Sequence, residues 1–62
     1  MQNPFITELV SRLDDNHREA FEERAGILEF DAGYPRDHAD CLALLYVLER
    51  YPEAVRQVFL RE

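Results

Sequence analysis

The chain contains no lysine and no tryptophan, and its only cysteine is Cys41. A single thiol cannot form a disulfide within the chain, so the cross-links that stabilise many small secreted domains are excluded. The longest uninterrupted apolar run, Cys41 to Leu48, falls far short of the roughly 20 residues that a membrane helix needs. The first ten residues, MQNPFITELV, show no basic segment ahead of a long apolar one. We therefore expect a cytoplasmic protein with no membrane partner.

The length of the chain sets its architecture. A chain of 62 residues is near the lower limit at which an apolar core alone holds a fold together. Hydrophobic residues make up 47% of it, which is typical of a folded chain and not of a disordered one. No internal repeat, low-complexity segment or long linker divides it. We expect residues 1–62 to form a single domain.

Negative charge is concentrated in the middle of the chain. There are 13 acidic residues and seven basic ones, all arginine, for a net charge of −6. Between Asp14 and Asp40 lie nine of the acids and only three of the arginines, so this stretch holds the whole excess. Such a field repels phosphate backbones, so we expect no direct nucleic-acid binding and favour a protein partner with a basic surface. An acidic surface that only keeps the protein soluble is the alternative.

Apolar spacing predicts two helices in the first half of the chain. Asn3 followed by Pro4 is typical of a helix start. A second helix is expected from about Asn16 to Asp31, after a short acidic stretch that can cap it. Within it, Gly26 costs up to about 1 kcal/mol against alanine unless a neighbouring helix packs closely there. The first helix presents the stripe Phe5, Ile6, Leu9, Val10 and Leu13, and the second the inward residues Phe21, Ala25 and Leu28, flanked by Ala20, Ile27 and Phe30.

A tight corner is expected at Ala32-Gly33-Tyr34-Pro35. Gly33 can adopt the left-handed conformation that ends a helix, and Pro35 can open the next one. Tyr34 is placed to fold back on Leu28 of the preceding helix. The third helix would then begin at Pro35 or Arg36 and end at Arg50.

The third helix contains eight consecutive apolar residues, from Cys41 to Leu48. An apolar surface on all sides indicates a central helix with neighbours on more than one face. A buried strand is the competing interpretation, but leucine and alanine outnumber the β-branched residues. A short fourth helix would begin at Pro52, with Val55, Val58 and Phe59 as its stripe. The expected fold class is all-α, a compact bundle of three to four short helices.

His38 and Cys41 are the residues from which a metal site or a nucleophile–base pair would be built, because their spacing places them on one helix face. One thiol is too few for the paired ligands of a structural zinc site, and a thiol at the start of an apolar run is usually buried and unreactive. Residues 31–40 lack the alternating oxygen ligands of a calcium loop. We expect no metal, cofactor or catalytic residue, with Cys41 in the core and both histidines in solvent. The other available metal ligands are Asp37, Asp40 and His17.

The two helices joined by the corner at residues 32–35 could also be interpreted as a helix-turn-helix motif, with Arg36 to Arg50 as the recognition helix. Its first turn carries one arginine against two acids, which is the wrong balance for approaching phosphates and base edges. We therefore do not favour DNA binding.

Residues 23–43, ERAGILEFDAGYPRDHADCLA, resemble a short helical module of bacterial phage and plasmid proteins. In that module an E-R-A-x-I-x-E-F-D segment runs into a glycine corner, an arginine and a second helix. It occurs appended to mobile-element primases and in small phage proteins. The matching positions are Glu23, Arg24, Ala25, Ile27, Glu29, Phe30, Asp31, Gly33, Arg36, Ala39, Leu42 and Ala43; the departures are Gly26, Ala32, Tyr34, His38 and Cys41. The resemblance implies a phage or plasmid origin in a bacterial host cell, and no catalytic residue comes with it.

Two acidic residues near the end of the second helix, Glu29 and Asp31, oppose the helix dipole and need a cation. Arg36 across the corner is the local candidate, and we predict that it pairs with one of them.

The function we expect is binding without catalysis. A small acidic phage or plasmid protein would dock on a larger partner. In one version of this hypothesis, the protein inhibits a host nucleic-acid-binding complex of the CRISPR type by occupying its basic groove, as anti-CRISPR proteins do. Carboxylates on a helix can take the place of phosphates in such a groove. The expected partner-binding residues are Glu19, Glu22, Glu23, Glu29, Asp31, Arg36, Asp37 and Asp40.

Two other interpretations remain open. An accessory module of a mobile-element replication or DNA-processing system would dock through aromatic anchors such as Tyr34, Tyr46, Tyr51 or Phe59. A homodimer would complete a core that is small for one short chain, so both monomer and homodimer are retained.

Overall fold

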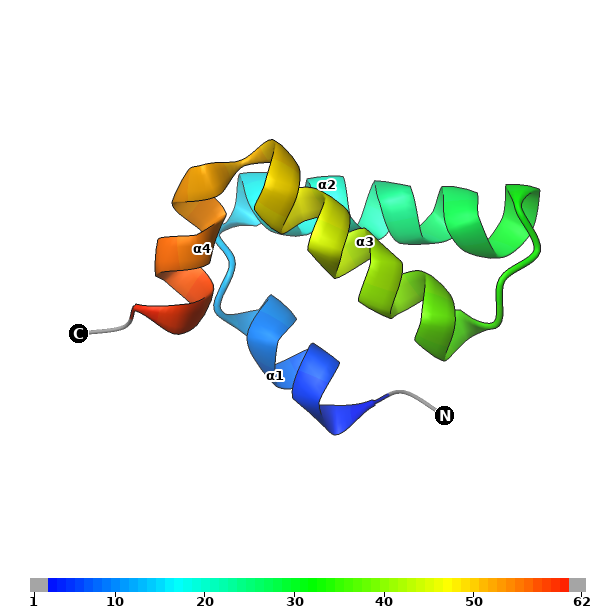
Figure 1. Ribbon diagram of the computed structural model, residues 1–62, viewed down its shortest axis with the longest axis horizontal. Helices are drawn as coiled ribbons and strands as arrows, with labels where there is room; N and C mark the ends of the chain where they lie inside the picture. Colours follow the sequence, from blue (N-terminus) through cyan, green and yellow to red (C-terminus); the bar gives the residue numbers. More distant parts are fainter. Residues whose placement is uncertain (1–2, 61–62) are drawn as a thin grey trace.

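The computed structural model describes residues 3–60, and all regular structure in that range is helical (Figure 1). The elements are α1 (Pro4–Ser11), α2 (Asp15–Gly26), η1 (Ile27–Asp31, a π-helical continuation of α2), α3 (Arg36–Arg50) and α4 (Pro52–Phe59). Helices α2 and α3 run in opposite directions and cross, while α1 lies along one side of them and α4 closes one end (Figure 1). The prediction of an all-α bundle of short helices is confirmed.

Side chains at the helix starts explain where α1 and α2 begin. Asn3 Oδ1 accepts a hydrogen bond from the backbone N–H of Phe5 at 2.8 Å, and Asp14 Oδ1 accepts one from the N–H of His17 at 2.8 Å. Each bond satisfies an N–H group that has no partner within the helix. Proline occupies the first position of both α1 and α4, as the sequence predicted.

The corner between η1 and α3 also forms where it was expected. Gly33 has a φ of 81°, the left-handed conformation that glycine adopts without steric cost. The backbone N–H of Tyr34 then donates to the carbonyl of Leu28 at 3.0 Å, which ties the corner to the preceding helix. The ring of Tyr34 lies against His38, with 5.0 Å between the ring centroids.

The second helix continues through Gly26 to Asp31, but its last turn is π-helical. There the N–H of Ala32 donates to the carbonyl of Ile27, five residues earlier, at 3.1 Å. Ile27 and Phe30 were expected to flank the buried face, yet they are 40% and 78% exposed.

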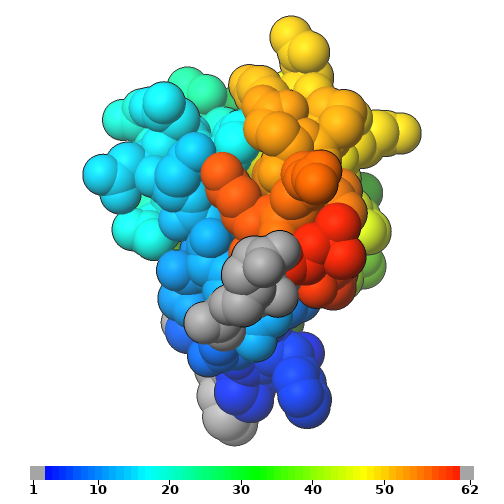
Figure 2. All heavy atoms as spheres, turned by 90° about the vertical axis from the view of Figure 1, so that its left-hand side faces the viewer, coloured from blue at the N-terminus to red at the C-terminus, as the bar shows by residue number. Residues whose placement is uncertain are grey.

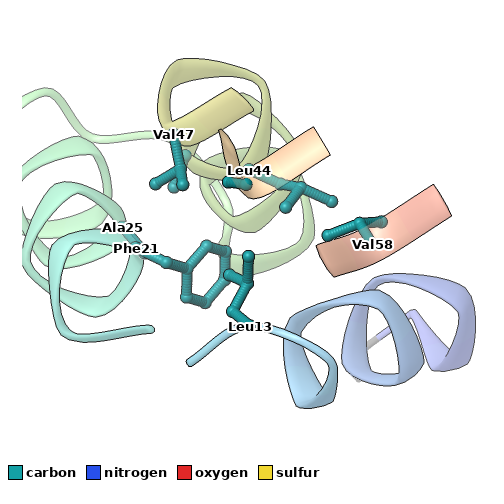
Figure 3. Close-up of a cluster of buried hydrophobic side chains, with 8 residues drawn as sticks. Leu13, Phe21, Ala25, Leu44, Val47 and Val58 are labelled. Atoms are coloured by element: carbon teal, nitrogen blue, oxygen red, sulfur yellow. The ribbon is translucent and has the colours of Figure 1, made fainter. Parts of the chain in front are cut away.

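The core lies where the four helices meet, and Figure 3 shows its central side chains pointing toward one another. Val47 of α3 and Val58 of α4 are completely buried. The remaining members of the buried cluster are Leu13, Phe21, Ala25, Ala43, Leu44 and Ala54. Because α1, α2 and α4 all contact α3, the prediction of a central third helix is confirmed.

One face of α3 nevertheless reaches solvent. Cys41 is exposed and Leu45 is 58% exposed, so the expectation of a buried thiol was wrong. The three shorter α-helices cannot enclose the fifteen-residue α3 on every side. Phe5 at the start of α1 is likewise 77% exposed, although it belongs to the predicted stripe. Within the described residues, no helix is both long and apolar enough to cross a membrane.

Candidate functional site

The side of α2 and η1 that faces away from the other helices is acidic at its start and apolar at its end. Helical spacing places Glu19, Glu23, Gly26, Ile27 and Phe30 along it, and we call these residues the outer α2 face. Both carboxylates are exposed, and so are the two apolar side chains that follow them. Protein interfaces combine apolar side chains with charged ones, and this face carries both kinds.

The two arginines of α2 do not neutralise these acids. Arg18 donates to the backbone carbonyl of Leu13 at 2.9 Å, and Arg24 lies 4.0 Å above the ring centre of Tyr46 on α3. Among residues 3–60, Glu19 and Glu23 form no ion pair. The carboxylates of the outer α2 face are therefore available to an external cation.

Gly26 lies in the middle of this face with an ordinary helical backbone, φ −62° and ψ −44°. A Cβ atom added there would meet no atom within 4 Å. No neighbouring helix of the described residues therefore packs closely against this glycine. Its cost to helix stability is thus not offset by any contact within the described structure.

A second charged group lies at the corner, on the inner side of α3. Arg36 Nε donates to Asp40 Oδ1 at 3.1 Å and Oδ2 at 3.3 Å, and Arg36 Nη1 contacts Glu29 Oε1 at 3.4 Å. The predicted pairing of Arg36 with an acid across the corner is confirmed for Glu29. The Asp40 side chain is only 6% exposed, so its assignment to a partner-binding surface was wrong. The sequence does not distinguish Asp37 from Asp40, but the fold leaves Asp37 exposed and buries Asp40.

Asp40 and Arg36 line one wall of a small cleft of about 130 Å³ between α1, α2 and α3. Ile6, Thr7, Val10, Phe21 and Glu22 line the rest. The space suits one side chain and is too small for an ordinary small-molecule substrate, whose pockets are typically about 300–1,000 Å³.

The remaining predicted partner-binding residues are Glu22, Asp31 and Asp37, and all three are exposed. Glu29 is half-buried and holds Arg36, so it contributes to the corner and less to the surface. The structure therefore divides the predicted set into an exposed acidic group and a paired group, Arg36, Glu29 and Asp40.

Sequence reasoning missed the group around His17. This side chain was expected in solvent, but only 7% of the residue is exposed. Its Nδ1 lies 3.0 Å from Gln57 Oε1, its Nε2 lies 3.1 Å from Glu53 Oε2, and its ring packs against Tyr51 at 5.2 Å. We call this group the His17 clamp, because it joins the start of α2 to α4, which Figure 2 shows side by side.

The hydrogen bonds around Gln57 determine the charge of the clamp. Asp14 N–H donates to Gln57 Oε1 at 3.0 Å, and Gln57 Nε2 donates to Asp14 Oδ2 at 2.9 Å, which fixes the orientation of the amide. His17 Nδ1 thus faces an acceptor oxygen, and so does Nε2. Only the imidazolium can donate from both nitrogens.

The shifted pKa values agree with this geometry. The hydrogen bond to Gln57, followed by that to Glu53, raises the pKa of His17 above 6.5, against the opposing effect of burial. The hydrogen bond donated by the backbone N–H of His17 lowers the pKa of Asp14 below 3.8. The pKa of Glu53 is lowered below 4.5, first by its own backbone N–H and then by the His17 ring. The clamp therefore joins the start of α2 to α4 through charged hydrogen bonds.

His38 and Cys41 are both exposed on α3. Within residues 3–60, no three histidine, cysteine or acidic side chains converge as a metal-binding group. Of the aromatic anchors considered, Tyr46 and Tyr51 are half-buried against Arg24 and His17, whereas Phe59 is 58% exposed.

Comparison with protein-family models, curated proteins and solved structures finds no match to this chain.

Proposed function

We propose that this chain is a protein-binding protein without catalytic activity that docks its acidic surface on a basic surface of a larger partner. The observation that carries the proposal is the group of exposed carboxylates Glu19, Glu22 and Glu23, which have no cationic partner among the described residues. The helix fixes the backbone positions of these carboxylates, so no backbone entropy is lost when a partner's arginines or lysines pair with them.

Charge of this density also affects the rate of association. A net charge of −6 on 62 residues attracts a basic surface over the range of the Debye length, about 8–10 Å at physiological salt. Binding should therefore be fast, and its affinity should fall as salt is added.

Proteins that hold DNA or RNA present the basic surfaces that such a ligand fits. We propose that the partner is a nucleic-acid-binding complex of the host, of the CRISPR surveillance type, and that the carboxylates occupy sites otherwise taken by phosphates. The resemblance of residues 23–43 to a phage and plasmid module supports this version.

The test is a pull-down with tagged protein from a bacterial lysate and from purified CRISPR effector complexes, washed at low and then at high salt. A nucleic-acid-binding complex that elutes as salt rises supports the proposal. A replication protein that resists salt would instead favour an accessory module that docks through aromatic residues, and capture of only this chain would favour a homodimer.

Charge reversal identifies the surface. We expect the triple substitution Glu19→Arg, Glu22→Arg and Glu23→Arg to abolish capture while the helical circular dichroism spectrum is retained. The matched control is Glu49→Arg, an exposed acid on α3, which should leave capture unchanged. Equal capture by the wild-type protein and the triple variant would refute the charge-based proposal.

A further inference from the structure

We propose that a basic amphipathic helix of the partner protein docks lengthwise on the outer α2 face, with its backbone passing closest at Gly26. This inference rests on the proposed function and specifies the partner element that it binds. Glu19 and Glu23 would pair with arginine or lysine side chains, and Ile27 and Phe30 would be covered by apolar ones.

The dimensions of the face match a short helix. Glu19 and Phe30 are eleven residues apart, which is about 16 Å along the axis at 1.5 Å per residue. A partner helix of about three turns therefore spans the face. Its apolar residues would recur every three or four positions, as in other helices that bind through one face.

Gly26 indicates where that helix comes closest. Its backbone is ordinary α-helix, so the left-handed freedom of glycine is not used, and no part of the described structure occupies the space of its missing side chain. Because glycine has no Cβ, a second backbone can approach the helix more closely at this position than at any other residue type. The side chains of Glu23, Ile27 and Phe30, which surround Gly26 on the helix surface, are all exposed to solvent.

Charge decides between the occupants of this face. A second copy of the chain packed face to face in parallel would place Glu19 and Glu23 against the same carboxylates, and one packed antiparallel would place them against apolar side chains with no cation; both are unfavourable. A nucleic acid would be repelled because its phosphates are also negative. A helix that carries arginine or lysine beside an apolar stripe satisfies both halves of the face, because it neutralises the acids and removes Phe30, 78% exposed, from water.

The probe is a synthetic 18-residue peptide with leucine at the a and d positions of a heptad and arginine at the flanking positions. We would titrate it into the ¹⁵N-labelled protein and measure affinity by calorimetry. The expected result is a set of chemical-shift changes confined to residues 19–31. Two further peptides serve as controls: a scrambled one with the same composition and charge but no apolar face, and one with glutamate in place of arginine.

Three variants test the contacts. We expect Phe30→Ser to weaken binding about tenfold or more, as loss of a buried aromatic anchor does. Gly26→Leu keeps the helix but fills the point of closest approach, and a similar loss is expected. The matched control is Leu45→Ser on α3, which removes a side chain of comparable exposure, 58%, and should change the affinity less than twofold.

The outcomes separate this inference from the proposed function. Equal binding of the scrambled arginine peptide would overturn the helix-docking inference and leave the charge-based function standing. Shift changes centred on α3 or α4, or unchanged affinity in both Phe30→Ser and Gly26→Leu, would also overturn it. If neither arginine peptide bound at all, both proposals would fail.

Discussion

Raising the pH from 6 to 8.5 should weaken the fold through deprotonation of His17. The pKa of this residue is raised in the folded protein, so the protonated ring contributes stability that is fully present below the ordinary value of 6.5. That contribution is lost as the pH rises through the raised pKa. Asp14 and Glu53 act in the opposite direction, since their pKa values are lowered and their contribution is lost only in acid. Stability should therefore be greatest at about pH 5–6.5.

The magnitude follows from what deprotonation does to the clamp. One ring nitrogen loses its proton and then faces an oxygen about 3 Å away, either Gln57 Oε1 or Glu53 Oε2. A hydrogen bond to a charged group contributes about 1.5–3 kcal/mol. The side chain of Glu53 is 61% exposed and regains water when the bond is lost, which reduces the effect. We expect a loss of about 1 kcal/mol of the free energy of unfolding.

The assay is urea denaturation followed by circular dichroism at pH 6, 7 and 8.5 in constant ionic strength. His17→Gln should remove the pH dependence between these values, while His38→Gln, a substitution of the exposed histidine on α3, should retain it. A wild-type protein as stable at pH 8.5 as at pH 6 would refute the imidazolium assignment. So would a pH dependence that survives in His17→Gln.

The remaining predictions concern single positions. Gly26→Ala should raise the free energy of unfolding by about 0.5–1 kcal/mol in the same denaturation assay, because the new methyl group enters open space in a helix. Asp40→Asn should lower it by about 1–2 kcal/mol by weakening the bond to Arg36, while Asp37→Asn one turn earlier should change it by less than about 0.5 kcal/mol. Cys41 should react with a thiol reagent in the native protein as fast as in urea, since it is exposed; strong protection would contradict its position on α3.

The helices were predictable because their signals lie within a few residues of each other. Asn3, Pro4, Gly33 and Pro52 act on their own turns through backbone geometry and local hydrogen bonds, so spacing and residue type were sufficient. The Arg36–Glu29 pair was predictable for the same reason, because the corner brings positions seven residues apart together.

The clamp could not be predicted, because its parts come from distant positions. Glu53 and Gln57 lie 36 and 40 residues beyond His17, and only the return of α4 to the start of α2 brings them within hydrogen-bond distance. Burial in α3 depends on tertiary packing in the same way. Asp40 is buried beside Arg36, whereas Cys41 is exposed, because successive side chains on an α-helix point about 100° apart and only the first of these two faces the other helices.

Helix α2 carries both the His17 clamp, which contributes to stability, and most of the outer α2 face, which is the proposed binding surface. The buried side of α2 contributes Phe21 and Ala25 to the core, and its start is held to α4 by the clamp. With these contacts in place, the outward residues contribute little to the fold, so the chain can leave Phe30 in water and keep Gly26 in mid-helix. A substitution on that face can then change binding and stability in opposite directions. We expect this at Gly26, where a substitution that adds a side chain should raise the free energy of unfolding and weaken binding of the partner helix.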